Sequence, residues 1–245
     1  MSSLRVAAGQ APTSVDDVER NVTTAVGLAR EADVVSAHVL VLSEAFLVGY
    51  APGVGREAVG EDDPRLAPLL DAAPEVLVLV GTVRTRPDGA RALALLAVHD
   101  GRVEHVYDKV HLDGDEVEAY APGDGVVVLD HPVLAASGHR LGLAICADAS
   151  QSTHVAACAA AGATAYAVSA AWFAGREGAR DATYAARARE SGLPVVAGCA
   201  TGPSYDGRGY IGGSCVVGPE GRLVSRVSGD GSDIAVAELP PARRH

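Results

Sequence analysis

Apolar and polar residues follow two different periods along the chain, and each period predicts its own kind of element. Short apolar runs bounded by turn residues are typical of strands, whereas apolar residues at helical spacing are typical of helices. The expected strands cover residues 4–8, 38–42, 76–83, 92–99, 102–107, 126–129, 140–145, 164–169, 194–199, 209–217, 223–227 and 234–238. The expected helices cover residues 14–32, with Ser14 as a plausible N-cap, and residues 64–73, 153–161 and 176–191.

The order of these elements predicts an α/β protein. Strands and helices alternate at both ends of the chain, and a run of strands lies between, which favours two sheets covered by helices. We find no linker, low-complexity segment or repeat of fixed period, so a single domain over residues 1–245 is the economical interpretation. Residues 108–125 are polar and irregular, and a long loop inside a compact domain is more often functional than idle.

Composition and charge narrow the classes of partner. The chain is 48% hydrophobic and 21% charged, as in ordinary globular proteins. Its net charge of −11, without a basic block, argues against nucleic acid or an anionic membrane surface as a partner. No apolar run approaches the roughly 20 residues that span a bilayer, and no signal peptide is recognisable. We therefore expect a cytoplasmic protein whose four scattered cysteines are reduced thiols, without a metal site.

Three chemically suggestive residues stand at strand ends or in the polar loop. Cys146 closes the apolar run 141–145, Glu44 follows the run 38–42, and Lys109 stands between two apolar positions. A thiol beside a general base becomes a strong nucleophile, and a nearby ammonium stabilises an oxyanion. These residue types fit acyl transfer through a thioester. The alternative is a Glu–Lys ion pair that ties two loops together beside an unrelated core cysteine.

The surrounding segments resemble the nitrilase superfamily, also called carbon–nitrogen hydrolases. SEAFLVGY at 43–50 is similar to the glutamate segment of that family, YDKVHLDGDEVEAYAPGD at 107–124 to its lysine segment, and LGLAICAD at 141–148 to its cysteine segment. Later segments at 186–196 and 212–224 match in the same order, so the resemblance covers nearly the whole chain. It implies a four-layer α-β-β-α sandwich of two mixed sheets, with no metal or organic cofactor.

The resemblance also implies residue roles. Cys146 corresponds to the nucleophile, Glu44 to the general base and acid, and Glu116 to a second glutamate that holds the lysine and positions substrate. Lys109 and the backbone N–H of Ala147 would bind the oxyanion.

Several other residues are expected to take structural or pocket roles, of which only that of Asp148 rests on the resemblance. Asp148 matches a residue that supports the turn after the nucleophile, and His111 is expected to be a structural hydrogen-bonding residue. The aromatic residues expected to line a pocket, with core packing as the alternative, are Phe46, Tyr50, Tyr120 and Trp172.

The departures from the family pattern fall on pocket walls. The residues after Cys146 are small and hydroxylated, with no aromatic wall and no arginine to clamp a carboxylate. We therefore expect a small amide or carbamoyl substrate. A nitrile hydrolase, an acyltransferase with the same triad, or a catalytically idle binding relative are the alternatives. The resemblance further implies a homodimer, and the alanine-rich helix 176–191, whose Arg187 and Arg189 would be solvated or contact a partner, is the expected interface.

Overall fold

The structure is a computed structural model that describes residues 2–242, and it contains two six-stranded mixed sheets. The first sheet has the order β14-β1-β2-β3-β4-β5 and the second β13-β12-β9-β8-β7-β6. The first sheet comprises β1 (Leu4–Gln10), β2 (Val39–Val41), β3 (Leu77–Thr85), β4 (Arg91–His99), β5 (Arg102–Asp108) and β14 (Asp233–Leu239). The second comprises β6 (Val128–Leu129), β7 (Leu141–Ile145), β8 (Ala165–Ala170), β9 (Val195–Cys199), β12 (Cys215–Val217) and β13 (Leu223–Arg226). A separate pair joins β10 (Thr201–Gly202) to β11 (Tyr210–Ile211).

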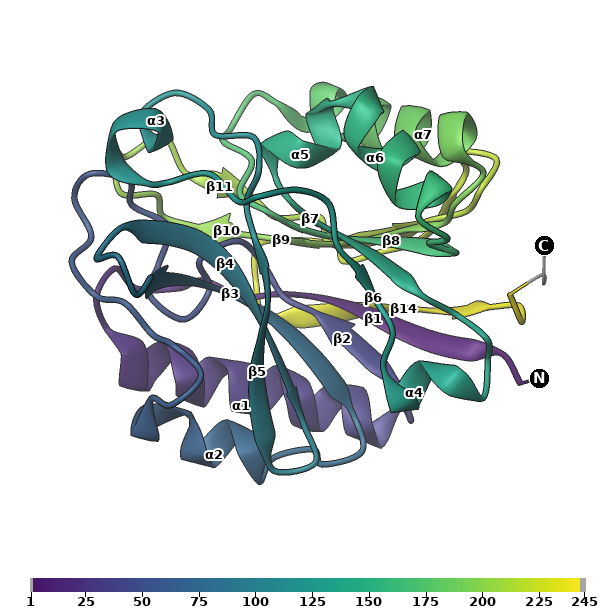
Figure 1. Ribbon diagram of the computed structural model, residues 1–245, viewed down its shortest axis with the longest axis horizontal. Coiled ribbons are helices and arrows are strands. Elements are labelled where there is room, and N and C mark those ends of the chain that lie inside the picture. The colour runs from purple at the N-terminus through teal and green to yellow at the C-terminus, as the bar shows by residue number, and fades with distance from the viewer. Residues whose placement is uncertain (1, 243–245) are drawn as a thin grey trace.

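Helices cover the outer face of each sheet, which gives four layers (Figure 1). The helices are α1 (Val18–Val34), α2 (Ala67–Leu70) with the 3-10 turn η1 (Pro64–Leu66), α3 (Glu116–Ala119), α4 (Pro132–Ala135), α5 (Ala147–Ser150), α6 (Ser152–Ala160) and α7 (Glu177–Ser191). In the picture α1 and α2 lie below the first sheet, and α5, α6 and α7 lie above the second. The expected four-layer sandwich is therefore confirmed. Within residues 2–242 no helix is both long and apolar enough to cross a bilayer.

Side chains alternate between the two faces of each strand. One face of each sheet packs against the other sheet and the opposite face packs against helices, so both faces are buried. In β1, Leu4 and Val6 face the second sheet while Ala7 packs beneath α1. In β7, Leu143 and Ile145 point between the sheets, whereas Ala144 points to the α5–α7 layer. Burial on both faces explains why the central strands have near-continuous apolar sequences.

Two of the differences from the sequence-based expectations have a direct cause in a contact or a backbone angle. Helix α1 begins at Val18 with Asp17 as its N-cap, whereas Ser14 exchanges two backbone hydrogen bonds with the Asn21 side chain (2.8 and 2.7 Å). The expected strand 209–217 is broken because Gly212 and Gly213 have φ of 57° and 73°, which separates β11 from β12.

Parallel strands bring the segments of interest to one edge. Strands β1, β2 and β3 run parallel in the first sheet, and β7, β8 and β9 run parallel in the second. Ligand sites in such sheets lie beyond the carboxyl ends of the strands. Glu44 follows β2, Lys109 follows β5 and Cys146 follows β7, so all three leave their strands near the junction of the two sheets.

Candidate active site

Cys146 stands on a strained turn between β7 and α5. Its φ of 44° and ψ of −95° are unusual for a residue with a side chain, and such conformations cost roughly 1–3 kcal/mol. Its N–H donates to the Ser169 carbonyl of β8 (2.8 Å), which continues the parallel pairing to the last residue before the turn. The thiol is half-buried, whereas Cys158, Cys199 and Cys215 are buried. Backbone strain at a partly accessible thiol is typical of a functional position.

Glu44 lies in the turn that follows β2, and its carboxylate is only 1% exposed. The turn packs directly on β3 at Gly81, where a Cβ atom would stand 2.2 Å from the Ser43 carbonyl oxygen and 2.6 Å from the Ala45 nitrogen. Only glycine allows this approach. The position of the Glu44 backbone is therefore fixed by a neighbouring strand.

Lys109, the only lysine of the chain, connects both glutamates. Its Nζ donates to Glu44 Oε1 and to Glu116 Oε1, each over 2.6 Å, and its side chain is 1% exposed. Burial alone would lower the pKa of Lys109, but Glu44, Cys146 and Glu116 raise it above its ordinary value. The ammonium is therefore charged, and two of its three N–H donors are used by the glutamates.

Glu116 of α3 organises the loop that carries the lysine. Its Oε1 also accepts from the Tyr50 hydroxyl (2.7 Å), and its Oε2 accepts from the Asp113 backbone N–H (2.9 Å). The carboxylate thus connects Lys109, Tyr50 and the polar loop. The geometry is compatible with the expected role of Glu116 in holding the lysine.

The protonation of the cluster is set by burial and by an excess of carboxylates. Desolvation raises the pKa of Glu44 to about 8, although Lys109 opposes the shift. Burial and the Glu44 charge raise the pKa of the Cys146 thiol, again opposed by Lys109. Glu44 Oε2 is buried without a hydrogen-bond partner among the described residues, so it is free to accept a proton. A neutral thiol beside an unsatisfied carboxylate oxygen suits general-base catalysis.

A second polar cluster lies behind the nucleophile. His111, Asp148 and His154 place potential metal-ligand atoms within 4.8 Å of one another. Both oxygens of Asp148 accept protein hydrogen bonds, and both ring nitrogens of His154 contact tyrosine hydroxyls. A metal ion would have to displace these contacts. The cluster therefore fits a hydrogen-bond network better than a metal site.

A cavity of about 500 Å³ opens onto Cys146 and Lys109. Of the residues expected to contact substrate, Tyr50, Ala147 and Trp172 line it. Phe46 and Tyr120 do not. They are 0% and 7% exposed and pack in the apolar cluster of α1, α2 and the outer face of the first sheet. Their expected pocket role is corrected to core packing, because Phe46 faces the layer of α1 rather than the junction of the sheets.

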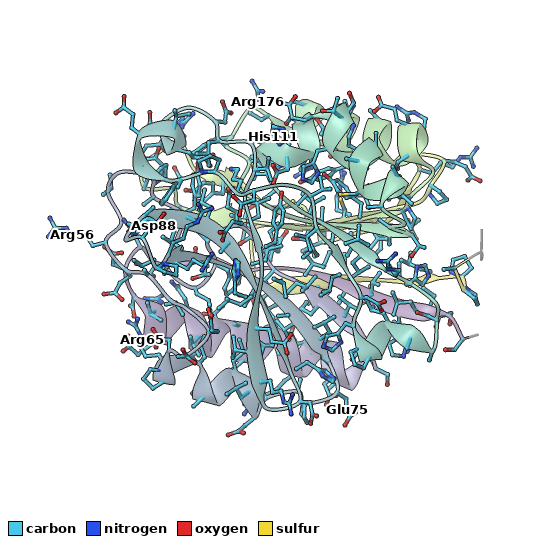
Figure 2. The ribbon with its side chains drawn as sticks, in the orientation of Figure 1. Arg56, Arg65, Glu75, Asp88, His111 and Arg176 are labelled. Carbon is cyan, nitrogen blue, oxygen red and sulfur yellow. The ribbon has the colours of Figure 1, made fainter. Side chains whose placement is uncertain are left out.

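Sequence reasoning missed much of the outer wall of the cavity. Arg176 precedes α7 and lies at the outer edge of the helical layer in Figure 2, and Arg208 stacks over the Phe173 ring at 3.6 Å. The other missed lining residues include Asp113, Asp115 and Tyr205. The segment after Cys146 contains no arginine, but two arginines from loops distant in sequence line the cavity. Only the general tendency of loops to carry function could have pointed to these positions.

Helix α7 also contributes a buried arginine. Arg187 is 9% exposed, and its Nη1 donates to the carbonyls of Ala149 (3.4 Å) and Ser150 (3.1 Å) at the end of α5. It does not lie on a solvated face. The short helix after Cys146 leaves carbonyl groups that need donors, and Arg187 donates to two of them. Arg187 therefore supports the segment that follows Cys146.

Comparisons with known proteins agree with this geometry. The family model described as Carbon-nitrogen hydrolase matches residues 5–244, whereas no curated protein matches the chain. An amidase from Nesterenkonia sp. superposes with a TM-score of 0.84 at 27% identity, over 98% of this chain and 92% of that one. A glutamate-to-glutamine, cysteine-to-alanine double mutant of the amidase from Nesterenkonia sp. AN1, in complex with acrylamide, gives 0.84 at 26% over 98% and 92%. A single glutamate-to-glutamine mutant, with the acetamide moiety of fluoroacetamide added covalently at the active site cysteine, gives 0.84 at 26% over 98% and 91%.

Proposed function

This chain belongs to the carbon–nitrogen hydrolase family, and on that premise we propose that it hydrolyses the C–N bond of a small amide or carbamoyl compound through a thioester on Cys146. The observation that carries the proposal is the cluster of Glu44, Lys109 and Cys146, in which one buried carboxylate oxygen of Glu44 has no hydrogen-bond partner among residues 2–242. A structural ion pair would satisfy both oxygens. A catalytic base needs one of them free.

In the first step Glu44 Oε2 takes the thiol proton as Sγ attacks the carbonyl carbon. Negative charge then develops on the carbonyl oxygen. The third N–H of Lys109 and the N–H of Ala147, which as the first residue of α5 lacks a partner within its helix, are available to stabilise that charge. Two preorganised donors, one of them charged, are the ordinary composition of an oxyanion hole.

In the second step the tetrahedral intermediate collapses. Glu44, now protonated, gives its proton to the departing nitrogen, and the acyl group stays on Cys146 as a thioester. Glu44 then takes a proton from a water molecule, which attacks the thioester. The acid leaves and the proton returns to Cys146, so a single carboxyl serves as acid and base in turn.

The choice of an amide over a nitrile has two supports. An amide already carries the oxygen that Lys109 and Ala147 would bind, whereas a nitrile must first be converted into a thioimidate. The Nesterenkonia amidase structures contain acrylamide and the acetamide moiety of fluoroacetamide, and we extend this substrate class to the present chain. The small residues Ala147 and Ser150 on the wall leave room near the thiol, and Arg176 and Arg208 add charge farther out.

A substrate panel tests the proposal. Short aliphatic amides, ω-amides with a terminal carboxylate, N-carbamoyl amines and matching nitriles are compared for ammonia release at equal concentration. We expect at least one amide or carbamoyl compound to exceed every nitrile, and Cys146→Ala to abolish release. If the nitriles are turned over faster than all the others, the amide assignment falls and only the thiol mechanism remains. Turnover by Cys146→Ala would remove the mechanism itself.

The expected cytoplasmic location is a proposal of the same kind. It is supported by the four cysteines, all of which are free thiols in the structure. Fractionation of the producing cells, with the chain followed by immunoblot, tests it. Recovery in the extracellular or membrane fraction would contradict it.

A further inference from the structure

The carboxylate of Asp148 is fully buried and receives four hydrogen bonds. Oδ1 accepts from the His111 backbone N–H (2.8 Å) and from His111 Nδ1 (2.8 Å). Oδ2 accepts from the Ile145 N–H (3.0 Å) and from the Tyr107 hydroxyl (2.7 Å). A carboxylate has about four lone-pair directions, so all of its accepting capacity is used. This side chain is 0% exposed and is bonded entirely within the protein.

The network extends through Tyr107 to His154 and Tyr166. Because the Tyr107 hydroxyl donates to Asp148, it must accept from His154 Nε2 (2.9 Å). His154 Nδ1 contacts the Tyr166 hydroxyl (2.8 Å), and in a neutral imidazole this nitrogen accepts the hydroxyl proton. Burial lowers the pKa of His154, in agreement with a neutral ring. Asp148 is therefore the end point of a chain of directed hydrogen bonds.

The donors to Asp148 come from two segments that carry the proposed chemistry. Tyr107 and His111 stand two residues before and two residues after Lys109. Ile145 is the last residue of β7 and immediately precedes Cys146. One carboxylate thus binds both sides of the lysine to the strand end that carries the nucleophile. The direct contacts of Lys109 are to the two glutamates, so they do not connect it to the backbone of β7.

We propose that Asp148 is a positioning residue that fixes the Lys109 ammonium relative to the Cys146 thiol. It touches neither substrate nor the reacting atoms. The effect on turnover rests on the function proposed above, whereas the effect on the reactivity of the thiol does not. A displacement of about 1 Å in a catalytic group can reduce turnover by up to about a hundredfold, so the two anchored segments leave little tolerance.

The distribution of the donors explains why an amide could not replace the carboxylate. Each oxygen of Asp148 receives one backbone N–H, from His111 or from Ile145, and a backbone donor cannot reverse its direction. In Asp148→Asn the side-chain NH₂ would face one of these N–H groups in either orientation. Two donors would then point at each other, and at least one of them would be buried without an acceptor.

The test compares the two buried tyrosines on either side of His154, of which Tyr107 contacts Asp148. Tyr107→Phe removes a donor to Asp148, whereas the matched control Tyr166→Phe removes a hydroxyl of similar burial that reaches only His154. Two quantities are measured for both variants and the wild type. They are kcat and KM for the best amide of the panel, and the rate of iodoacetamide alkylation at Cys146, located by peptide mass spectrometry.

We expect Tyr107→Phe to lower kcat by about tenfold with little change in KM, and to slow alkylation roughly threefold, because a displaced Lys109 stabilises the thiolate less. Tyr166→Phe should stay within about twofold of wild type in both measurements while losing similar thermal stability. Asp148→Asn should exceed Tyr107→Phe in both effects.

Equal effects of the two tyrosine variants would overturn the inference, because they would indicate a merely structural network. Wild-type kcat and alkylation rate in Tyr107→Phe would overturn it as well. If the wild-type protein releases ammonia from no amide or carbamoyl compound, the proposed function fails. The alkylation rates then still decide whether the network positions the thiol and the lysine.

Discussion

Glu44 is the residue whose ionisation decides whether the cluster is ready to react. The site contains one ammonium and two carboxylates that are withdrawn from water, beside the half-buried Cys146 thiol. Two neighbouring carboxylates and one cation carry a surplus negative charge, which favours a proton on one of them. The consequence is a base whose pKa lies near neutrality rather than in the acid range.

This arrangement predicts an unusual acid limb in the pH profile. Because burial raises the pKa of Glu44 to about 8 and only its ionised form accepts the thiol proton, kcat/KM should increase with pH through about that value. The charge of Glu116 raises the pKa of Glu44. Glu116→Gln should therefore shift the acid limb of kcat/KM to lower pH, independently of any change in the maximal rate.

Steady-state kinetics between about pH 3.5 and pH 9.5 measure the limb, since this range covers the ordinary and the raised carboxyl pKa. The matched control is Glu118→Gln, which neutralises an exposed carboxylate of the same short helix and should leave the limb in place. An acid limb at the ordinary carboxyl pKa in the wild-type protein, or an unshifted limb in Glu116→Gln, would contradict the assignment of Glu44 as the base.

At the scale of elements, the site depends on close backbone contacts between strands. Gly81 of β3 admits the Glu44 turn, and Gly123 admits the carbonyl of Asp108 just before Lys109, where a Cβ atom would stand 2.2 Å from that oxygen. The backbone on both sides of the ion pair thus rests against a residue without a side chain. Rigid support of this kind limits the movement of catalytic groups.

Two glycine-to-alanine substitutions distinguish a glycine that is needed for close backbone contact from a glycine that only weakens its helix. Gly81→Ala should destabilise the protein by about 2 kcal/mol or more, because its methyl group meets backbone atoms that cannot rotate away, and it should lower kcat by displacing Glu44. Gly27→Ala, in α1 with no atom within 4 Å of the added methyl, should stabilise it by about 0.5–1 kcal/mol with unchanged kcat.

Urea unfolding and steady-state kinetics of both variants provide the measurements. A Gly81→Ala protein with wild-type stability would show that the β3 backbone can yield. A Gly81→Ala protein that loses stability but keeps its kcat would show that Glu44 does not depend on this contact.

The sequence predicted elements well where burial alone determines the pattern. Residues 141–145 and 76–83 are buried on both faces, so their apolar runs could only be strands. The sequence-based prediction failed where a tertiary contact determines where an element begins. Ser14 resembles an N-cap, but Asn21 binds its backbone, and Asp17 caps the helix instead. The short helices α4 and α5 escaped notice because four residues contain no period.

The same distinction holds for the site. Glu44 and Cys146 could be found because each follows an apolar run, and Lys109 because it lies in a segment of familiar pattern. The outer pocket could not, since Arg176 and Arg208 come from separate loops whose meeting place is set by the whole fold. Phe46 packs in the core although it stands only two residues after Glu44, because its side chain faces the layer of α1 and not the cavity.

At the scale of the whole molecule, the candidate site lies at the interface between the two sheets. Ser169 of β8 accepts the Cys146 N–H with its carbonyl, and its hydroxyl donates across the interface to the Leu42 carbonyl (2.5 Å), two residues before Glu44. The intersheet core behind this contact is apolar. The Cys146 turn and the Glu44 turn therefore belong to different sheets, so the position of the thiol relative to the carboxylate depends on how the two sheets pack.

We expect the molecule to form a homodimer. The family resemblance motivates this prediction, and α7 offers an outer face with several partly exposed alanines that a second copy could cover. Light scattering at micromolar concentration should give twice the chain mass of 24.9 kDa. A charge-reversing change at the exposed Arg189, Arg189→Glu, should weaken the association, whereas Arg20→Glu on exposed α1 should not. A monomeric wild-type mass would refute the dimer.

The presence of a single, buried lysine has a consequence for chemistry applied from outside. Acylating reagents that modify amines find no lysine side chain on the surface of the folded protein, because Lys109 is 1% exposed and bonded to two carboxylates. Its ε-amine reacts only in molecules whose site has opened enough to separate it from both partners. With fast reclosing, the extent of lysine acylation reports the equilibrium population of open molecules. The catalytic centre thereby contains its own chemical probe of local unfolding.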